Sequence, residues 1–474
     1  MPNNWYCVAA GGISSSLETG PERLVSDWPG YGARQGQSEA NQQGLRYDSA
    51  LVCRESCVLQ FIYSQLIRVL LPFILLRLWW QGRQAPELRR NWQQRLGFLP
   101  RISGTVVWVH AVSVGETIAA APMVRRLLAR SPGITILMTA MTDTGLTQAK
   151  KMFGDQVQYA YAPYDTPGSI RRFLNRTNPR ILVIMETEIW PNMIRQSRSR
   201  RVPVFLVNAR LSERSARGYE RIKSLVAPIM RSISWVAAQA EKDAERFRRI
   251  GVAASKVAVT GSVKFDVDIP DAVREASQKL KGTFASRPVW IAGSTHEGED
   301  VQLLAAHRQL LVSHPDALLI LVPRHPERFE SVTEKVSRQR LSLARRSLGE
   351  DPSSADVYLG DTMGELMMLY GASDVAFVGG SLIERGGHNP LEPAGWGIPV
   401  ISGPQVFNFE TIYQRLLDDR GVTMVEDADE LYHRLLTLFN DAGERKASGQ
   451  RALSVVNKNR GALDRVVDGI IERV

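Results

Sequence analysis

Acidic residues stand behind two apolar runs in the first half of the chain. Glu116 follows TVVWVHA (105–111) in the small-residue segment VSVGE, and Glu186 closes RILVIME (180–186), two residues before Glu188. Glu116 also opens a helical pattern, and a helix N-terminus favours the ionised form of a carboxylate. An ionised carboxylate can accept the proton of a hydroxyl group as that hydroxyl attacks. Glu116 is therefore a candidate general base, with simple complementation of the helix dipole as the alternative.

Lys264 stands behind another apolar run, KVAVTGS (256–262). A cation at the end of a strand suits the negative charge that develops on a phosphate leaving group. Glu186 and Lys264 are thus candidates for groups that act beside Glu116. The alternative for each of them is a surface salt bridge.

Three segments of the second half have the residue types of an anion site. IAGSTHEGE (291–299) has the pattern of a strand, a small-residue loop and a helix start, which can present backbone N–H groups to a phosphate. Arg324 and His325 end the run LVPRH and can both donate to a phosphate. DTMGEL (361–366) opens a further helix.

The most specific segment is VGGSLIERGGHNPLEPAGWGIPVISGP (378–404), in which a glycine-rich loop leads into a helix. Asn389 is the expected N-cap of that helix and Glu392 lies in its first turn. A carboxylate there could bind both hydroxyls of a ribose while the helix N-terminus meets a phosphate. The alternative is a loop whose glycines only allow two helices to pack closely.

Short apolar runs alternate with helical patterns from residue 100 onwards, and this alternation predicts the elements that position these residues. The runs cover 105–111, 134–140, 180–186, 202–209, 234–239 and 256–262, and then 288–294, 317–324, 341–347, 356–361, 374–381, 398–404 and 421–427. Runs that are apolar almost throughout are typical of parallel strands covered on both faces. Two successive arrays predict an α/β protein with two Rossmann-like, doubly wound domains that face a cleft, with ligands bound at the carboxyl ends of the strands.

Composition limits the classes of function. The chain has 474 residues, 44% of them hydrophobic, and a net charge of +10, which suggests an anionic partner. Its cysteines, Cys7, Cys53 and Cys57, all lie in the first 57 residues, which fits a reducing compartment for the remaining chain. The seven histidines have no metal-ligand spacing, so we expect no metal.

The first 81 residues have a different pattern. We interpret 1–57 as a disordered extension that need not belong to the natural protein, because it has no helix or strand periodicity. We interpret residues 58–81 as a membrane anchor that either spans the bilayer or lies in its plane. Tryptophans and arginines flank its end at Trp80, as on the cytoplasmic side of a membrane, although a buried core helix is the alternative. The remaining domains are 82–268, a linker over 269–288, and 289–474.

From about residue 59 onwards, the chain resembles the Kdo transferases of lipopolysaccharide assembly, glycosyltransferases that move 3-deoxy-D-manno-octulosonic acid (Kdo) from CMP-Kdo to a lipid A precursor. The resemblance rests on eight segments in the family's order: HAVSVGE, ETEIWPN, VNARLSERS, GSVKFD, AGSTHEGE, VPRHPER, DTMGE and GGHNPLEPAGWGIPVI. The family does not normally have the N-terminal extension.

The resemblance implies an inverting enzyme of the GT-B fold, with the acceptor lipid IVA bound by 82–268 and the donor CMP-Kdo by 289–474. It implies no cofactor and a place on the cytoplasmic side of the inner membrane, against an anionic membrane surface. Glu116 resembles the family's general base, and Glu186 and Lys264 its transition-state stabilisers. The residues that match its CMP site are Arg324, His325, Met363, Gly364, Glu365, Asn389, Pro390, Leu391 and Glu392.

Two other functions fit parts of the sequence. One is a different membrane-associated GT-B enzyme with a UDP-sugar donor. The other is a basic, membrane-tethered binding protein for nucleic acid or anionic lipid, although no nucleic-acid motif is present and we expect no nucleic-acid partner. The sequence does not indicate the number of Kdo units transferred, the acylation that the acceptor needs, or the oligomeric state.

Overall fold

The structure is a computed structural model that describes residues 58–80, 82–83 and 91–473. The expected disordered extension, 1–57, lies outside the described residues.

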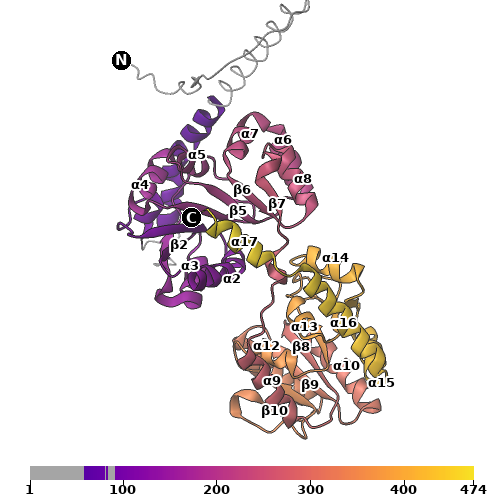
Figure 1. Ribbon diagram of the computed structural model, residues 1–474. Helices are drawn as coiled ribbons and strands as arrows, with labels where there is room; N and C mark the ends of the chain where they lie inside the picture. The colour runs from indigo at the N-terminus through magenta and orange to yellow at the C-terminus, as the bar shows by residue number, and fades with distance from the viewer. Residues whose placement is uncertain (1–57, 81, 84–90, 474) are drawn as a thin grey trace, which may run out of the picture. The chain divides into compact units, whose positions relative to one another are not determined.

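A parallel sheet of seven strands forms the first half of this chain (Figure 1). In sheet order its strands are β3 (Gln158–Tyr161), β2 (Ile134–Ala140), β1 (Thr105–His110), β4 (Ile181–Met185), β5 (Val204–Ala209), β6 (Trp235–Ala238) and β7 (Val257–Val259). The prediction of parallel strands covered on both faces is confirmed, since β1, β4 and β5 are buried over almost their whole length. The sequence pattern does not predict β3, because this four-residue edge strand, QYAY, has no apolar run and its first two residues are not fully buried.

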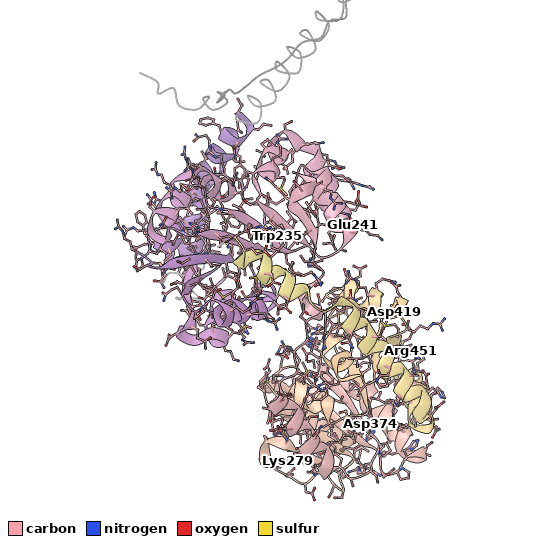
Figure 2. All side chains as sticks on the ribbon, in the orientation of Figure 1. Trp235, Glu241, Lys279, Asp374, Asp419 and Arg451 are labelled. Atoms are coloured by element: carbon pink, nitrogen blue, oxygen red, sulfur yellow. The ribbon has the colours of Figure 1, made fainter. Side chains whose placement is uncertain are left out.

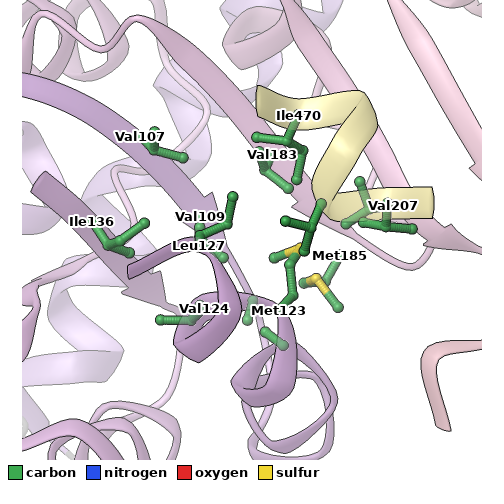
Figure 3. Packing of buried hydrophobic residues seen from close by; sticks show 14 of the residues in the cluster. Val107, Val109, Met123, Val124, Leu127, Ile136, Val183, Met185, Val207 and Ile470 are labelled. Atoms are coloured by element: carbon green, nitrogen blue, oxygen red, sulfur yellow. The ribbon is translucent and has the colours of Figure 1, made fainter. Parts of the chain in front are cut away.

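Helices cover this sheet on both faces, and alternate residues of each strand face the two cores. The helices are α2 (Val114–Arg130), α3 (Asp143–Phe153), α4 (Pro167–Thr177), α5 (Pro191–Ser199), α6 (Glu213–Arg221), α7 (Lys223–Ser232) and α8 (Glu241–Arg249), with short 3-10 turns η2 (Trp92–Leu96), η3 (Gly154–Gln156), η4 (Ala254–Lys256) and η5 (Val263–Phe265). Val107 and Val109 of β1 pack with α2 (Figure 3), whereas Val106 and Trp108 pack on the other face with α4.

A second parallel sheet of seven strands follows. In sheet order its strands are β10 (Leu343–Arg345), β11 (Val357–Leu359), β9 (Leu318–Pro323), β8 (Val289–Thr295), β12 (Val375–Val378), β13 (Val400–Ser402) and β14 (Val422–Met424). Its helices are α9 (Asp271–Thr283), α10 (Asp300–Ser313), α11 (Phe329–Arg338), α12 (Leu366–Gly371), α13 (Leu391–Trp396), α14 (Glu410–Asp418), α15 (Ala428–Asn440) and α16 (Ala442–Asn459), with η6 (Pro326–Arg328) and η7 (Arg346–Leu348). Val273 and Leu280 of α9, in the segment expected to be a linker, pack into a core of this sheet.

The last helix, α17 (Ala462–Ile471), packs on the first sheet, although the sequence analysis grouped 289–474 as one domain. Ile470 joins the core formed by β1, β4 and α2 (Figure 3). A Cβ atom at Gly469 would come within 2.5 Å of the ring of Trp235, so this helix lies close against the ring. Trp235 is labelled in Figure 2. Asp266 accepts hydrogen bonds from the N–H groups of Gly461 (2.6 Å) and Leu463 (2.7 Å) and so fixes the start of the helix.

The helix Val58–Trp80 is the one described helix that is long and apolar enough to cross a membrane, with a mean hydropathy of 1.7. Most of its large apolar side chains are exposed to solvent, such as Phe61 (62%), Phe73 (66%) and Trp80 (66%). An apolar helix surface of this size in water is typical of a membrane contact. The helix is therefore consistent with membrane association.

Polar side chains attach this helix to the first sheet's domain. The hydroxyl of Tyr63 donates to Asp165 (3.0 Å), and that of Ser64 donates to Asn192 Oδ1 (3.0 Å). Asp165 also accepts from the N–H groups of Asn192 (3.0 Å) and Met193 (2.7 Å) in the first turn of α5. Burial raises the pKa of Asp165 to about 6, even though these donors act to lower it. The helix thus docks on α5, which begins at Pro191 and directly follows Glu186 and Glu188.

We expect Tyr63→Phe to lower the free energy of unfolding by about 1.5–3 kcal/mol, because it removes a hydrogen bond to a buried carboxyl group. Chemical denaturation of the detergent-solubilised protein measures this change. Tyr159→Phe is the matched control: its hydroxyl donates to the Gly154 carbonyl (2.6 Å) at an exposed position, and the expected loss is below about 1 kcal/mol. Equal losses in the two variants would contradict a specific role for the Tyr63–Asp165 contact.

Candidate active site

The carboxyl ends of three neighbouring strands bring the predicted residues of the first half together. Strands β1, β4 and β5 lie side by side, and the strand order reverses between β1 and β4. Ligands of doubly wound sheets bind at such a switch point. Glu116 follows β1, Glu186 follows β4 and Arg210 follows β5, so the three loops converge at this edge of the sheet.

Glu116 is half-buried in the first turn of α2 and is held in a capping box. One carboxylate oxygen accepts from the Val112 N–H (2.8 Å) and the other from the Ser113 hydroxyl (2.9 Å). Ser113, the N-cap of α2, also accepts from the N–H of Glu116 (3.3 Å). Burial raises the pKa of Glu116 despite these hydrogen bonds, and the nearby carboxylates Glu188 and Glu186 raise it further. A carboxylate with a raised pKa is a stronger base than an ordinary glutamate.

Glu186 occupies a strained backbone position at the end of β4. Its φ of 54° lies in the left-handed region, which costs a residue other than glycine roughly 1–2 kcal/mol. Its N–H nevertheless donates to the Val207 carbonyl (3.0 Å), so the strand pairing continues to the turn. Its carboxylate pairs with Arg210 (3.2 Å) and keeps only 17% of its side chain exposed. Strain of this kind is often found at functional sites.

Lys264 lies in η5, behind β7, within electrostatic reach of Glu186. Burial lowers the pKa of this lysine, the carboxylate of Glu186 opposes that shift, and the guanidinium of Arg210 adds to it. Its Nζ lies 5.7 Å from the centre of the Phe409 ring. Lys264 and Arg210 line one pocket together with Phe409 and Arg415. This pocket therefore has three cationic side chains, of which Arg210 and Arg415 were not predicted from the sequence.

The predicted residues of the second half follow β9, β11 and β12, and the predicted anion segment 291–299 runs from β8 into the loop behind it. The strand order reverses again here, between β8 and β12. Arg324 and His325 follow β9 and are exposed, and the Arg324 N–H donates to the Thr295 carbonyl behind β8 (3.0 Å). The charge of Arg324 also reaches Glu392 at the start of α13 and acts to lower the pKa of that carboxyl group, which burial raises.

The segment Asn389–Glu392 is preorganised by its own side chains. The N-cap of α13 is Pro390, one residue after the Asn389 that the sequence predicted. Asn389 Oδ1 nevertheless accepts from the Leu391 N–H (3.1 Å) at the start of this helix. The Asn389 amide also donates to the Glu392 carboxylate (3.3 Å). Pro390 completes this turn and is buried.

The stretch Met363–Gly364–Glu365 is fixed by an arginine that the sequence analysis missed. Arg346 of η7 forms two hydrogen bonds to the Glu365 carboxylate, of 2.6 Å and 2.7 Å, and lowers the pKa of Glu365. Gly364 has a φ of 89°, a conformation that favours glycine, and Met363 is 57% exposed. The Glu365 carboxylate therefore fixes the inner side of this loop. The backbone at Gly364 and the side chain of Met363 form the exposed side of the loop.

Glu299 is a further residue that the sequence analysis did not single out. It is fully buried, and its two carboxylate oxygens accept four hydrogen bonds. The donors are the N–H groups of His296 (2.9 Å), Gly380 (2.7 Å), Ser381 (2.9 Å) and Leu382 (3.0 Å). Glu299 thus ties the loop behind β8 to the loop behind β12. The local sequence signal for Glu299 was its position at the start of a helix pattern. Acidic residues are common at helix starts, so this signal did not distinguish Glu299 from other glutamates.

Residues 90–267 match the sequence profile of a family described as "3-Deoxy-D-manno-octulosonic-acid transferase (kdotransferase)". A protein of Haemophilus influenzae, named 3-deoxy-D-manno-octulosonic acid transferase, is 41% identical over 415 residues, which cover 86% of this chain and 97% of that protein. A protein of the same name from Bordetella pertussis is 36% identical over 86% of this chain and 98% of that protein. The chain belongs to the Kdo transferase family.

Membership makes the chain a glycosyltransferase that transfers Kdo in lipopolysaccharide biosynthesis, as the sequence predicted. Among solved structures, the UDP-GlcNAc 2-epimerase of Neisseria meningitidis has a TM-score of 0.51 and 15% identity, covering 78% of this chain and all of that one (100%). This likeness supports the GT-B fold of the Kdo transferase. The C-terminal CMP-Kdo binding domain of a protein from Acinetobacter baumannii is 37% identical, covers 39% of this chain and 98% of that one, and has a TM-score of 0.38. Among the described residues, no group of three or more His, Cys, Asp or Glu side chains could hold a metal ion.

Proposed function

We propose that this Kdo transferase uses CMP-Kdo as its donor and lipid IVA as its acceptor, and that it inverts the configuration at the anomeric carbon. The observation that carries the proposal is Glu116, a half-buried carboxylate with a raised pKa at the switch point of the first sheet. Glu186 follows the neighbouring strand β4 and acts on the charge of Glu116, and Lys264 lies within electrostatic reach of Glu186.

In the proposed reaction, Glu116 takes the proton of an acceptor hydroxyl as its oxygen attacks the anomeric carbon of Kdo. The bond from that carbon to the phosphate oxygen breaks, and its electron pair leaves with CMP. One direct displacement with one base, and no covalent intermediate, inverts the anomeric centre. Lys264 stabilises the charge that develops on the leaving phosphate, because a fixed cation in a half-buried site is worth more than one in water.

We assign the nucleotide to the second sheet. The exposed side chains of Arg324 and His325 can donate to the phosphate. Glu392 faces the same region as Arg324, and its carboxylate can accept hydrogen bonds from the two ribose hydroxyls. The fixed backbone of Met363–Glu365 and the turn Asn389–Leu391 complete the proposed CMP site.

We further propose that the enzyme binds the cytoplasmic face of the inner membrane. The exposed apolar side chains of the helix Val58–Trp80 supply hydrophobic contact with the bilayer. Exposed arginines lie on the domain to which this helix docks, including Arg171 and Arg176 of α4 and Arg195 and Arg198 of α5. These arginines can bind anionic headgroups, including the phosphates of the acceptor.

The direct test is transfer of Kdo from CMP-Kdo to lipid IVA by the detergent-solubilised protein, with product masses that also count the Kdo units. Transfer supports the proposal, and binding of CMP without transfer would remove lipid IVA as the acceptor. We expect CMP, but not UMP, to raise the unfolding temperature, since a ligand present at 100 times its Kd stabilises by about 2.7 kcal/mol. Stabilisation by UMP instead would favour the UDP-sugar alternative.

A further inference from the structure

Two histidines that no part of the proposed mechanism uses meet at the switch point of the second sheet. His296 follows β8 and His388 lies in the loop between β12 and α13. Their Nε2 atoms are 2.9 Å apart, and the planes of the two rings are nearly parallel, with an interplanar angle of 3°. We call His296 and His388 the histidine pair.

The surrounding chain builds this contact. Glu299 fixes the backbone of both loops through the N–H groups of His296 and Gly380. Gly380 has a φ of 72°, and a Cβ atom there would come within 3.0 Å of the His388 ring and 3.4 Å of the His296 ring. Glycine at this position therefore leaves the space in which the two rings meet.

The charges around the histidine pair are mostly positive. His325 packs edge-on against His296, with 5.3 Å between ring centres. The Tyr413 hydroxyl donates to the His388 carbonyl (3.3 Å). The charged groups that act on the pair are Arg324 and His325 behind β9, Arg328 of η6 and Arg385 of the loop behind β12. Glu299 before α10 and Tyr413 of α14 contact the backbone of the two histidines, and Glu392 of α13 lies within electrostatic reach of Arg324.

A contact between two imidazole nitrogens needs one proton, because one nitrogen must donate and the other accept. In the neutral pair, this is the N–H of one ring. A second proton would give the pair a positive charge among Arg324, Arg328 and Arg385. Burial lowers the pKa values of both His296 and His388 to about 4, with Arg324 acting on both rings and Arg328 and Arg385 on His296, so the pair is neutral near pH 7.

We propose that the histidine pair is a proton-linked part of the phosphate site, which takes up one proton from solvent when the nucleotide phosphate binds. This inference rests on the proposed CMP site. The added phosphate charge offsets the surrounding arginines and raises the proton affinity of the pair. The phosphodiester of a CMP-sugar has one negative charge, whereas free CMP has nearly two above its second pKa of about 6. Proton uptake therefore stabilises the charge that appears as CMP leaves.

The sign of the pH effect follows from linkage. Between the low pKa of the free pair and the raised pKa of the bound pair, only the complex holds the extra proton. CMP affinity therefore falls as pH rises, and its Kd increases by up to about tenfold per pH unit.

Calorimetric titration of the full-length protein with CMP at pH 7.5, in buffers of different ionisation enthalpy, measures the number of protons taken up. We expect about one proton per CMP, and none for cytidine, which has no phosphate. His296→Gln and His388→Gln should each abolish most of this uptake and flatten the pH dependence of the Kd. His314→Gln, at the remote end of α10, is the matched control and should behave as the unaltered protein.

The outcomes separate this inference from the proposed donor. CMP binding without proton uptake overturns the role of the histidine pair and leaves the donor site intact, whereas failure of CMP to bind overturns both. His325→Gln should weaken CMP binding but retain proton uptake. Loss of the uptake in His325→Gln, with retention in His296→Gln, would assign the proton to His325 and overturn the inference. Unfolding temperatures of the variants, measured without ligand, establish that each one is folded.

Discussion

Glu116→Gln is expected to lower the rate of Kdo transfer by about 10²–10⁴-fold, since it replaces the base that accepts the proton of the acceptor hydroxyl. The fold should persist. A glutamine side chain can accept from the Val112 N–H and donate to the Ser113 hydroxyl, so it retains both contacts of the capping box. CMP affinity should be unchanged, because the nucleotide is assigned to the second sheet. Initial rates with saturating CMP-Kdo and lipid IVA measure the effect.

Glu444→Gln is the matched control for this substitution. Glu444 occupies the same third position of α16, behind a glycine and with Asp441 as N-cap. Its replacement changes a helix start without changing the proposed site, and we expect transfer within about twofold of the unaltered enzyme. Near-normal transfer by Glu116→Gln would show that Glu116 is only a helix cap.

The same assignment predicts the acidic limb of the pH profile. Only the ionised carboxylate of Glu116 can accept a proton, so kcat/KM should fall as pH falls through the pKa of this residue. An ordinary glutamate has a pKa of about 4.3. Because burial and the neighbouring carboxylates raise the pKa of Glu116, kcat/KM should begin to fall at a higher pH than it would with an ordinary glutamate as the base.

Lys264→Met is expected to lower kcat by about 10²–10³-fold, since it removes a fixed positive charge beside the leaving phosphate. The Kd of CMP should change far less, because the cation acts mainly on charge that develops in the transition state. Lys264→Arg retains the charge and should recover part of the rate. Steady-state kinetics and CMP titrations of the same preparations separate the two effects.

Lys256→Met provides the control, since Lys256 lies in η4 of the same domain and its ammonium group donates to the Arg231 carbonyl at the surface. We expect it to leave kcat within about twofold. If Lys264→Met raised the Kd of CMP as much as it lowered kcat, Lys264 would be a binding group and not a transition-state stabiliser.

Local patterns determined much of this protein. The apolar runs identified thirteen of the strands, and only β3, with QYAY at a sheet edge, lacked the signal. Glu186 and Arg324 end two of those runs, and the segments behind other runs held Glu116, Lys264 and Asn389. Hydrophobic periodicity and turn residues are properties of residues that are close in the chain, so they can be read from the sequence. Because the carboxyl ends of parallel strands share one edge of the sheet, the sequence also predicts which loops carry the site.

Strand order and long-range contacts were decided by the tertiary structure. The sequence does not say that β4 lies beside β1, which brings Glu186 near Glu116, or that Arg210 pairs with Glu186. The apolar stripe of α17 fits either sheet as a pattern, and its packing into the core of β1, β4 and α2, with Gly469 against Trp235, selects the first.

Partners far apart in the chain show the same limit. Tyr63 and Asp165 are 102 residues apart, and His296 and His388 are 92 apart. A lone tyrosine or histidine has many possible environments, and its sequence neighbours do not select among them. Burial, hydrogen bonding and charge are sums over residues that meet only in the folded chain, so the sequence determined which side chains this enzyme has at its strand ends, and the fold decided their pKa values and their partners.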